Sequence, residues 1–524
     1  MLPINLPSID RLSLTELISQ MIVVRACGML YDHQIQHPSW ELSTAALQEL
    51  IGEYGVGGVI LLGGSAPEIS LKTKQMQLWA KVPLLIAADV EEGVGQRFSG
   101  ATVFPPPMAL QSVSAKYAEA MGKITAEEAQ AIGLNWLLAP IVDVNNNPEN
   151  PVINVRAFGI TVGEVMGATR AFIAGAKEYP VLTTAKHFPG HGDTSVDSHL
   201  QTPSILHDRQ RFENVEFPPF SNAIAAGVDV IMTAHIFVPQ LDSRNIATLS
   251  PEIITGILRN HLAFEGIIIT DALMMAGISE LDSPSEEIAV QAVRAGVDML
   301  LMPIDPIATI KAIVAAVESG EITRDRIEAS VARIWQAKQK VCGHPADLTK
   351  LGNPQNLAIA KEIATKSTTV SAALPHLHSP NPSEDEALRY LNLVIVDDML
   401  SCGDFLNQRS PAIRMPKAHA YQQIIADSTT LENLQYDSFD QVFMQIFSRG
   451  NPFRGSTNLH SLTCDLIEKL ISAHKFEAIT VYGSPYCLDK FLNIIPSEVP
   501  WGFSYSQQPE SQLAILQELG FADI

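Results

Sequence analysis

Short runs of aliphatic and β-branched residues recur through the first 300 positions of the chain, and segments with helical polar–apolar spacing separate them. The runs lie at 21–27, 57–63, 82–88, 134–141, 181–187, 229–235, 266–270 and 297–302. Strands buried on both faces of a parallel sheet show such unbroken runs, and their alternation with helices indicates βα units. Eight units predict a (β/α)8, TIM-like barrel. A doubly wound parallel sheet is the structural alternative.

The pattern changes after a helix predicted over 326–341, where Gly and Pro interrupt the regular spacing at 342–354. The sequence therefore predicts three parts. Residues 1–342 form the barrel, and 343–389 form a connecting helix and strand followed by a Pro/Ser-rich linker. Residues 390–524 form a smaller α/β domain with an open sheet, whose strands are expected at 391–398, 441–447, 477–484 and 501–506.

Charge and composition narrow the classes of partner. The chain holds 35 basic and 57 acidic residues among 524, a net charge of −22, which disfavours binding to nucleic acid or to an anionic membrane. No uncharged apolar run is long enough to span a membrane, and the amino terminus does not resemble a secretion signal. The five scattered cysteines include no CxxC pair, so we expect a soluble cytoplasmic protein without disulfides or structural zinc.

Polar residues stand at the carboxyl ends of four of the predicted strands. Asp89, Lys186, His187, His235 and Asp271 each end or directly follow an apolar run. In a (β/α)8 barrel the chemistry lies at this end of the strands, so these side chains are expected to converge on one mouth. Asp271 has a second interpretation, as the N-cap of the following helix.

The densest cluster of ionisable residues is KHFPGHGDTSVDSH at 186–199, which holds three histidines, two aspartates and Lys186. Its Pro and Gly residues exclude a regular helix and predict a loop over the barrel mouth. Asp197 and His199 have the spacing of a carboxylate that orients an imidazole general acid/base. A metal site and a set of turn-capping side chains are the alternative interpretations.

Two further segments offer groups that could hold a ligand. The segment 143–159 is rich in Asn and Pro and ends near Arg156, which can clamp hydroxyls or carboxylates or can serve the loop's own carbonyls. The segment 89–97 offers Asp89 as an acceptor for sugar hydroxyls and Arg97 as its brace. The glycines at 55–64 precede a strand, and no phosphate loop occurs, so no nucleotide cofactor and no other cofactor is predicted.

With these residues in view, the chain resembles the family-3 glycoside hydrolases, in their β-N-acetylglucosaminidase branch. KHFPGHGDT followed by DSH carries the resemblance, which is strong over about residues 10–340. It implies Asp271 as nucleophile, His199 as acid/base with Asp197 as its partner, and a sugar held by the remaining five site residues, Asp89, Arg97, Arg156, Lys186 and His187. The chain departs from the family's pattern at Glu92, where a glycine is usual, and at Gly95, where an apolar residue is usual.

The resulting hypothesis is a retaining, exo-acting β-N-acetylglucosaminidase that acts on a small carbohydrate, such as a cell-wall fragment in peptidoglycan turnover or a chitin oligosaccharide. A β-glucosidase or a glycoside phosphorylase of the same family is the first alternative, since a neutral imidazole does not repel an attacking phosphate. A metal-dependent barrel hydrolase and an inactive sugar-binding protein are the alternatives from other classes. No particular oligomeric state is predicted.

Overall fold

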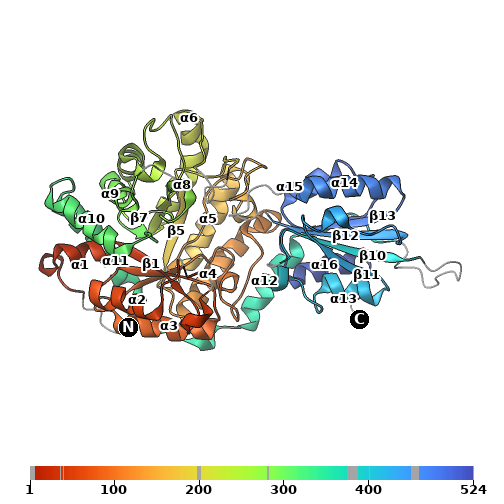
Figure 1. The fold of residues 1–524 in the computed structure, drawn as a ribbon, viewed down its shortest axis with the longest axis horizontal. Coiled ribbons are helices and arrows are strands. Elements are labelled where there is room, and N and C mark those ends of the chain that lie inside the picture. The colour runs from red at the N-terminus through yellow and green to blue at the C-terminus, as the bar shows by residue number, and fades with distance from the viewer. Residues whose placement is uncertain are drawn as a thin grey trace. The chain divides into compact units, whose positions relative to one another are not determined.

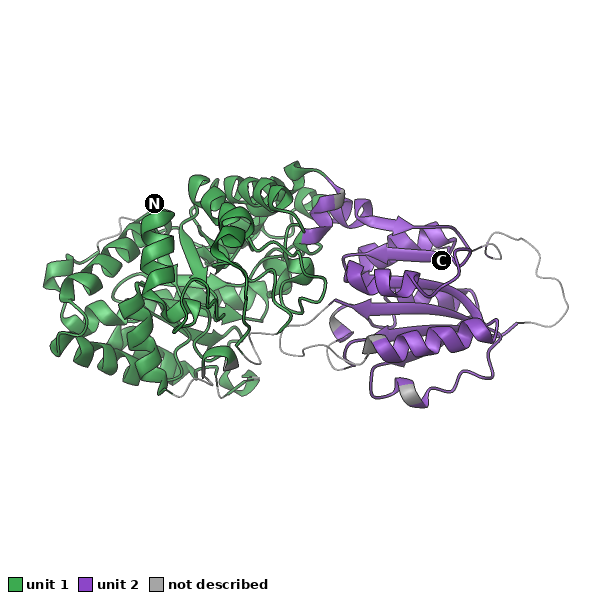
Figure 2. Cartoon of the chain, turned by 90° about the horizontal axis from the view of Figure 1, so that it is seen from above, with its two compact units in different colours: residues 1–107, 114–359 green, residues 108–113, 360–524 purple. Residues whose placement is uncertain are grey.

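The computed structural model describes residues 6–35, 37–38, 40–196, 202–279, 283–374, 377, 388–399, 402–449 and 459–522. The chain divides into two compact units, shown in Figure 2. Residues 1–107 and 114–359 form the first unit, and residues 108–113 and 360–524 form the second. The division falls inside helix α12 (Pro354–Lys366).

The first unit is built on eight parallel strands, as the spacing of apolar runs predicts. They are β1 (Ile22–Cys27), β2 (Gly58–Leu62), β3 (Leu85–Ala88), β4 (Trp136–Leu137), β5 (Leu182–Phe188), β6 (Val230–Thr233), β7 (Ile267–Ile269) and β8 (Leu300–Leu301). Their order is β7-β6-β5-β4-β3-β2-β1-β8, and a parallel bridge between Ile269 and Met299 joins the two outer strands. The sheet therefore closes into a (β/α)8 barrel, and the doubly wound alternative is wrong for this unit.

Helices cover the outside of this sheet (Figure 1). They are α1 (Leu14–Ser19), α2 (Thr44–Glu49) with the π-helical turn η3 (Leu50–Tyr54), α3 (Ala66–Trp79), α4 (Ala115–Ala131), α5 (Val162–Ala176), α6 (Arg209–Arg211) with η7 (Phe212–Glu216) and α7 (Phe217–Ala225), the π-helix η9 (Glu252–His261), α8 (Ala276–Ser279), α9 (Ser285–Ala295), α10 (Pro306–Glu318) and α11 (Arg324–Val341). Side-chain N-caps mark several starts, including Thr161 of α5, where Glu164 completes a capping box.

One strand is shorter than its apolar run predicts. The run at 134–141 pairs as a strand only over Trp136–Leu137. Pro140 has no amide hydrogen to donate to a neighbouring strand. Pairing resumes beyond it, at an isolated bridge between Ile141 and Lys186. Residues 138–143 therefore continue along the barrel wall and carry the next polar side chain, Asp143, to the same end as Lys186.

The second unit is a six-stranded sheet in the order β11-β10-β12-β13-β14-β9. Its strands are β9 (Thr368–Val370), β10 (Tyr390–Val396), β11 (Gln422–Ala426), β12 (Gln441–Ser448), β13 (Phe476–Gly483) and β14 (Trp501–Ser504), all parallel except β9, which runs antiparallel to β14. Helices α13 (Pro411–Ala418), α14 (Leu459–Ser472), α15 (Pro485–Leu492) and α16 (Pro509–Leu519) accompany it.

Alternating side chains of the central strands build a core on each face of this sheet. In β10, Leu391, Leu393 and Ile395 belong to one buried cluster, and Val394 and Val396 belong to the other. A parallel sheet covered on both faces requires such continuous apolar strands. The four strands predicted from apolar runs correspond to β10, β12, β13 and β14.

Candidate active site

The described residues of the predicted site lie at the carboxyl ends of barrel strands. Asp89 directly follows β3, and Asp271 follows β7 after Thr270. Lys186 and His187 are the two residues before the last residue of β5. Since the barrel strands are parallel, these ends open on the same side of the barrel. The strand framework therefore brings together residues that are as many as 182 positions apart in the chain.

Lys186 is the centre of a buried network of charges. Its Nζ lies 2.8 Å from Asp89 Oδ1 and 2.7 Å from Glu91 Oε1. Glu91 also accepts two hydrogen bonds from Arg156, from Nε at 2.9 Å and from Nη2 at 2.8 Å. Two positive and two negative groups thus compensate each other, as buried charges require.

The pKa shifts of this network follow from its pairing. Burial opposes the charged form of Glu91, but Arg156 and Lys186 outweigh it and hold the pKa of Glu91 well below its usual range. Burial likewise acts against charged Lys186, but Asp89 and Glu91 raise its pKa. Both groups are charged near neutrality. Only 2% of the Lys186 side chain is exposed, against 24% of that of Asp89, so Asp89 is the more accessible member of the pair.

Arg97 supports Asp89 through the main chain. Its Nε donates a hydrogen bond of 3.2 Å to the backbone carbonyl of Asp89, and the rest of the arginine is exposed. The loop that carries it is closed by Gly95, whose amide donates to the Thr102 carbonyl at 2.8 Å. A Cβ at position 95 would lie 2.5 Å from the Ala101 carbonyl oxygen. The glycine that departs from the family's pattern is therefore required by this loop.

His187 is held by a buried aspartate that the sequence analysis did not single out. Asp143 Oδ2 lies 2.8 Å from His187 Nδ1 and accepts the His187 amide at 3.1 Å, and Asp143 Oδ1 accepts the His191 amide at 2.7 Å. Burial opposes the charge of Asp143, but these hydrogen bonds and the neighbouring imidazoles lower its pKa. Asp143 thereby fixes the ring of His187 and the start of the loop after β5.

His191, in the loop after β5, packs against His187. It is buried, its Nδ1 lies 2.9 Å from Thr194 Oγ1, and its ring packs edge-to-face against that of His187. Burial, together with His187, lowers the pKa of His191 to about 4, and the Asp271 carboxylate acts in the opposite direction. His191 is therefore neutral near pH 7, and Asp271 is close enough to influence it.

Asp271 is half-buried between the ends of β6 and β7. Its amide donates to the Thr233 carbonyl at 3.2 Å, and its Oδ1 accepts the amide of Ala272 at 2.8 Å. The adjacent His235 is fully buried and contacts Thr248 Oγ1 through Nδ1 and the Ala272 carbonyl through Nε2. The carboxylate of Asp271 is thus fixed by the strand ends around it.

The loop after β5 is anchored at both of its described ends. Asp193 Oδ2 lies 2.7 Å from His207 Nε2, and Thr202 Oγ1 donates to the Gly277 carbonyl at 2.6 Å. Asp197 and His199, predicted as the acid/base pair, lie outside the described residues. Their roles therefore stay predictions.

Glu91 and Asp143 are the site residues that sequence reasoning missed. Glu91 stands two positions after Asp89, and Asp143 stands two positions after the apolar run at 134–141. The rule that selected Asp89 and Asp271, a carboxylate at or just beyond the end of a buried strand, also applies to Asp143.

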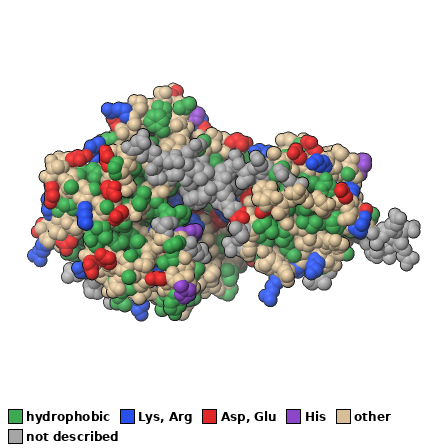
Figure 3. All heavy atoms as spheres, viewed as in Figure 1, with side chains coloured by type: hydrophobic (Ala, Val, Ile, Leu, Met, Phe, Trp, Pro, Cys, Tyr) green, Lys and Arg blue, Asp and Glu red, His purple; other side chains and the backbone are tan. Residues whose placement is uncertain are grey.

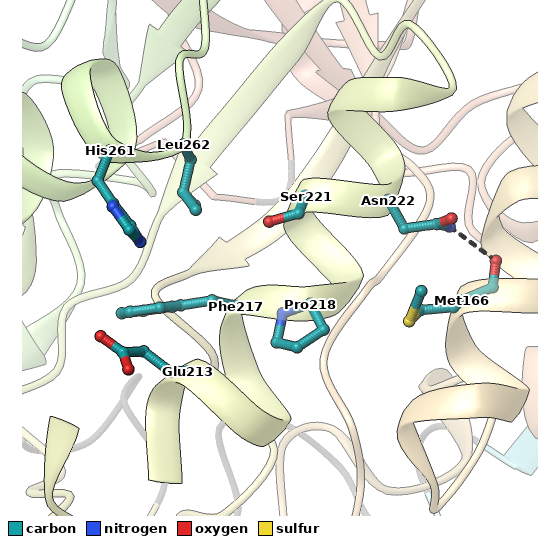
Figure 4. Close-up of a pocket in the computed structure, with 8 residues that line it drawn as sticks. All are labelled: Met166, Glu213, Phe217, Pro218, Ser221, Asn222, His261 and Leu262. Atoms are coloured by element: carbon teal, nitrogen blue, oxygen red, sulfur yellow. Dashed lines mark hydrogen bonds between the residues drawn. The ribbon is translucent and has the colours of Figure 1, made fainter. Parts of the chain in front are cut away.

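Four other observations bear on the alternatives. A surface hollow of about 590 Å³ lies among α5, α7 and η9, where Phe217, Pro218 and Leu262 line it (Figure 4), and it includes none of the predicted site residues. Within the described ranges, no three His, Cys, Asp or Glu side chains are arranged to hold a metal ion. Among the same residues, no helix is long and apolar enough to cross a membrane. Acidic and basic side chains are interspersed on the visible surface (Figure 3).

The fold and the mouth define a class of protein, a (β/α)8 barrel with an ionisable site at the carboxyl ends of its strands. The chain belongs to glycosyl hydrolase family 3. Residues 13–337 match the N-terminal domain of that family, and residues 383–520 match the bacterial C-terminal domain. The family resemblance inferred from KHFPGHGDT and DSH is confirmed.

Three similar proteins are informative. A β-hexosaminidase A of Pseudoalteromonas piscicida is 36% identical over 362 residues, which cover 62% of this chain and 60% of that protein. A β-N-acetylglucosaminidase/β-glucosidase of Cellulomonas fimi is 29% identical over 333 residues, which cover 60% of this chain and 59% of that one. The structure of a family-3 β-N-acetylglucosaminidase from Paenibacillus sp. FPU-7 superposes with a TM-score of 0.79 at 28% identity, covering 98% of this chain and 97% of that one. The chain thus spans about 60% of the length of the first two relatives.

Proposed function

We propose that this protein is a retaining, exo-acting β-N-acetylglucosaminidase with Asp271 as its nucleophile. The observation that carries the proposal is the position of Asp271 just past the end of β7, where Thr233 and Ala272 fix it. This is the same end of the barrel that carries the buried network of Lys186, Asp89 and Glu91. The names of the β-hexosaminidase and β-N-acetylglucosaminidase relatives support the choice of sugar.

The described residues supply the groups that would bind a terminal sugar. Asp89 offers a partly exposed carboxylate to hydroxyl donors, and Lys186, held in place by Asp89 and Glu91, offers ammonium hydrogens to hydroxyl acceptors. Arg156 is orientated by its two hydrogen bonds to Glu91 and one to the Val152 carbonyl. Because ion pairs and hydrogen bonds already fix these side chains, they need not be ordered when the sugar binds, and they can orient its ring toward the nucleophile.

The chemistry then takes two steps. Asp271 attacks the anomeric carbon as the bond to the leaving oxygen breaks, and His199, orientated by Asp197, gives that oxygen a proton. In the second step His199 takes a proton from water, whose oxygen displaces Asp271 and releases the sugar with its configuration retained. Asp197 and His199 enter this scheme from the sequence alone.

A paired assay tests the proposal. The wild-type protein should hydrolyse an aryl β-N-acetylglucosaminide faster than the matching aryl β-glucoside, and Asp271→Asn should abolish hydrolysis because an amide is not a nucleophile for this step. Asp305→Asn is the matched control: Asp305 is an exposed N-cap at the same end of the barrel, where Asn caps equally well.

Each alternative gives a distinct outcome. Asp271→Asn with wild-type activity contradicts the proposal, and a preference for the glucoside assigns the chain to β-glucosidase activity instead. Release of a sugar phosphate in phosphate buffer identifies a phosphorylase. Loss of activity with a chelator, restored by metal, identifies the metal-dependent alternative.

A further inference from the structure

Three arginines surround one buried aspartate at the end of the barrel opposite the mouth. Asp298 stands two residues before β8, and its carboxylate accepts hydrogen bonds from three arginines. These come from Arg259 Nη2 at 2.7 Å, Arg333 Nη1 at 3.0 Å and Arg326 Nη1 at 3.4 Å. Ser330 Oγ and the amide of Ile268 also donate to it, at 2.7 and 3.0 Å. Asp298 is therefore fully satisfied as an acceptor.

The positive charge of this cluster exceeds its negative charge by two. Burial lowers the pKa of Arg259 and of Arg326, and the charge of the neighbouring guanidinium groups lowers it further. Asp298 acts in the opposite direction. In a protein whose net charge is −22, this is a local excess of positive charge. An additional anion close to these groups would be attracted by it.

A surface hollow of about 550 Å³ gives access to the cluster. Arg259 and Arg333 line it together with Gln336, Glu265, Phe264 and three alanines. The small side chains of Ala263, Ala329 and Ala332 leave space in front of the guanidinium groups. Glu265 is exposed at the edge of the hollow and reduces the excess charge to one.

Arg333 is the residue orientated to use this space. Its Nη1 donates to Asp298 and to the Ala329 carbonyl, whereas the N–H groups on Nε and Nη2 have no acceptor within the described part of the chain. Those two positions form the edge of a guanidinium group that matches two oxygens of a phosphate. Gln336 lies three residues further along α11 and lines the same hollow.

We propose that this hollow is a binding site for a phosphate-type oxyanion, held by the Nε/Nη2 edge of Arg333 and by the amide of Gln336. The anion would neutralise the remaining charge of the arginine cluster. The site lies at the amino ends of the barrel strands and is separate from the sugar-binding mouth, so the inference does not depend on the proposed activity.

Calorimetric titration of the full chain with inorganic phosphate tests the site, at an ionic strength held constant with sodium chloride. We expect saturable binding to the wild-type protein. Arg333→Gln removes the charged edge, and Gln336→Glu places a carboxylate on an exposed position of the hollow without touching Asp298. Each should weaken binding at least tenfold. Arg294→Gln, which removes an exposed arginine paired with Glu321, is the matched control and should leave the affinity unchanged.

The absence of saturable heat from the wild-type protein would overturn the proposal. Unchanged affinity in Gln336→Glu would also overturn it, and would place the phosphate elsewhere, including at the mouth as a substrate of a phosphorylase. If Arg333→Gln fails to fold, Gln336→Glu still tests the site, because Gln336 is exposed and its substitution leaves the contacts of Asp298 intact.

Discussion

At the scale of single residues, Glu91 is the group on which the candidate site depends most. Its carboxylate forms ion pairs with both Lys186 and Arg156, and only 3% of its side chain is exposed. Breaking a buried ion pair by removing one partner leaves an uncompensated charge, which is strongly destabilising. The same loss would release two of the groups proposed to hold the sugar.

Glu91→Gln should therefore reduce both stability and activity. We expect a loss of roughly 3 kcal/mol in the free energy of unfolding, and a fall in kcat/KM on the order of 10²-fold from the misplaced lysine and arginine. Urea unfolding and steady-state hydrolysis of an aryl N-acetylglucosaminide provide the two measurements.

Glu178→Gln is the matched control for this change. Glu178 pairs with Lys123 on the surface, where both side chains are 46% exposed, so the substitution should change stability by less than about 1 kcal/mol. If Glu91→Gln behaved like this control in both measurements, the network would not position the site.

At the scale of elements, two loops fix each other at the mouth. Asn150, in the loop after β4, donates through Nδ2 to the carbonyls of His191 and Gly192, each at 2.9 Å. Gly192 lies so close to the same loop that an added Cβ would stand 1.8 Å from the Val144 carbonyl oxygen. The position of the loop after β5 is therefore set by contact with the loop after β4.

Gly192→Ala should displace this loop and, with it, the segment that leads to Asp197 and His199. We expect kcat/KM to fall by roughly 10²-fold, since small displacements of catalytic groups have effects of this size. Gly163→Ala, in the first turn of α5 where no atom lies within 4 Å of the new Cβ, should keep full activity. Equal activity in the two variants would show that the tight contact does not position the loop.

The sequence predicted those elements whose pattern reports burial directly. The eight apolar runs of the barrel and four strands of the second unit were predictable because strands buried on both faces are continuously apolar. Strand β11 was not, because Gln422–Ala426 is an edge strand whose residues are only partly buried. The ends of β4 were also misplaced, because the chain continues along the barrel wall past Pro140 with only an isolated bridge, between Ile141 and Lys186.

In the site, too, some features follow from a local sequence pattern and others do not. Asp89, Lys186, His187 and Asp271 follow from their place at strand ends, and the same rule could have found Asp143. The pairing of Asp143 with His187 and of Glu91 with Arg156 becomes visible only when the barrel brings distant segments together. Asp143 and His187 are 44 residues apart, and Arg156 and Glu91 are 65 apart. No local pattern encodes such pairs.

At the scale of the whole molecule, the second unit contributes an acid that titrates near neutrality. Burial raises the pKa of Glu477 to about 7, although Tyr421 Oη donates hydrogen bonds to both of its carboxylate oxygens, at 3.0 and 2.9 Å. The usual value is 4.5. Between pH 4.5 and 7 the folded state therefore binds a proton that the unfolded chain has lost.

The stability contributed by Glu477 is accordingly present below pH 4.5 and is lost as the pH rises through 7. Glu477→Gln should remove this part of the pH dependence, measured as unfolding of the second unit in the full chain at several pH values between 4.5 and 8. Glu498→Gln, on an exposed residue of the same unit, should retain it. Identical pH profiles in the two variants would contradict the assignment, and hydrolysis by the barrel should remain unchanged in both.

The central claim is that Asp271 becomes covalently attached to the sugar. Mass spectrometry of the protein treated with a fluorinated N-acetylglucosaminyl donor, which forms the intermediate but releases it slowly, tests this most directly. The account predicts one N-acetylhexosaminyl adduct on the peptide that contains Asp271, and none on the Asp271→Asn variant. Turnover of the substrate with inversion at the anomeric carbon, or an adduct on another residue, would contradict it.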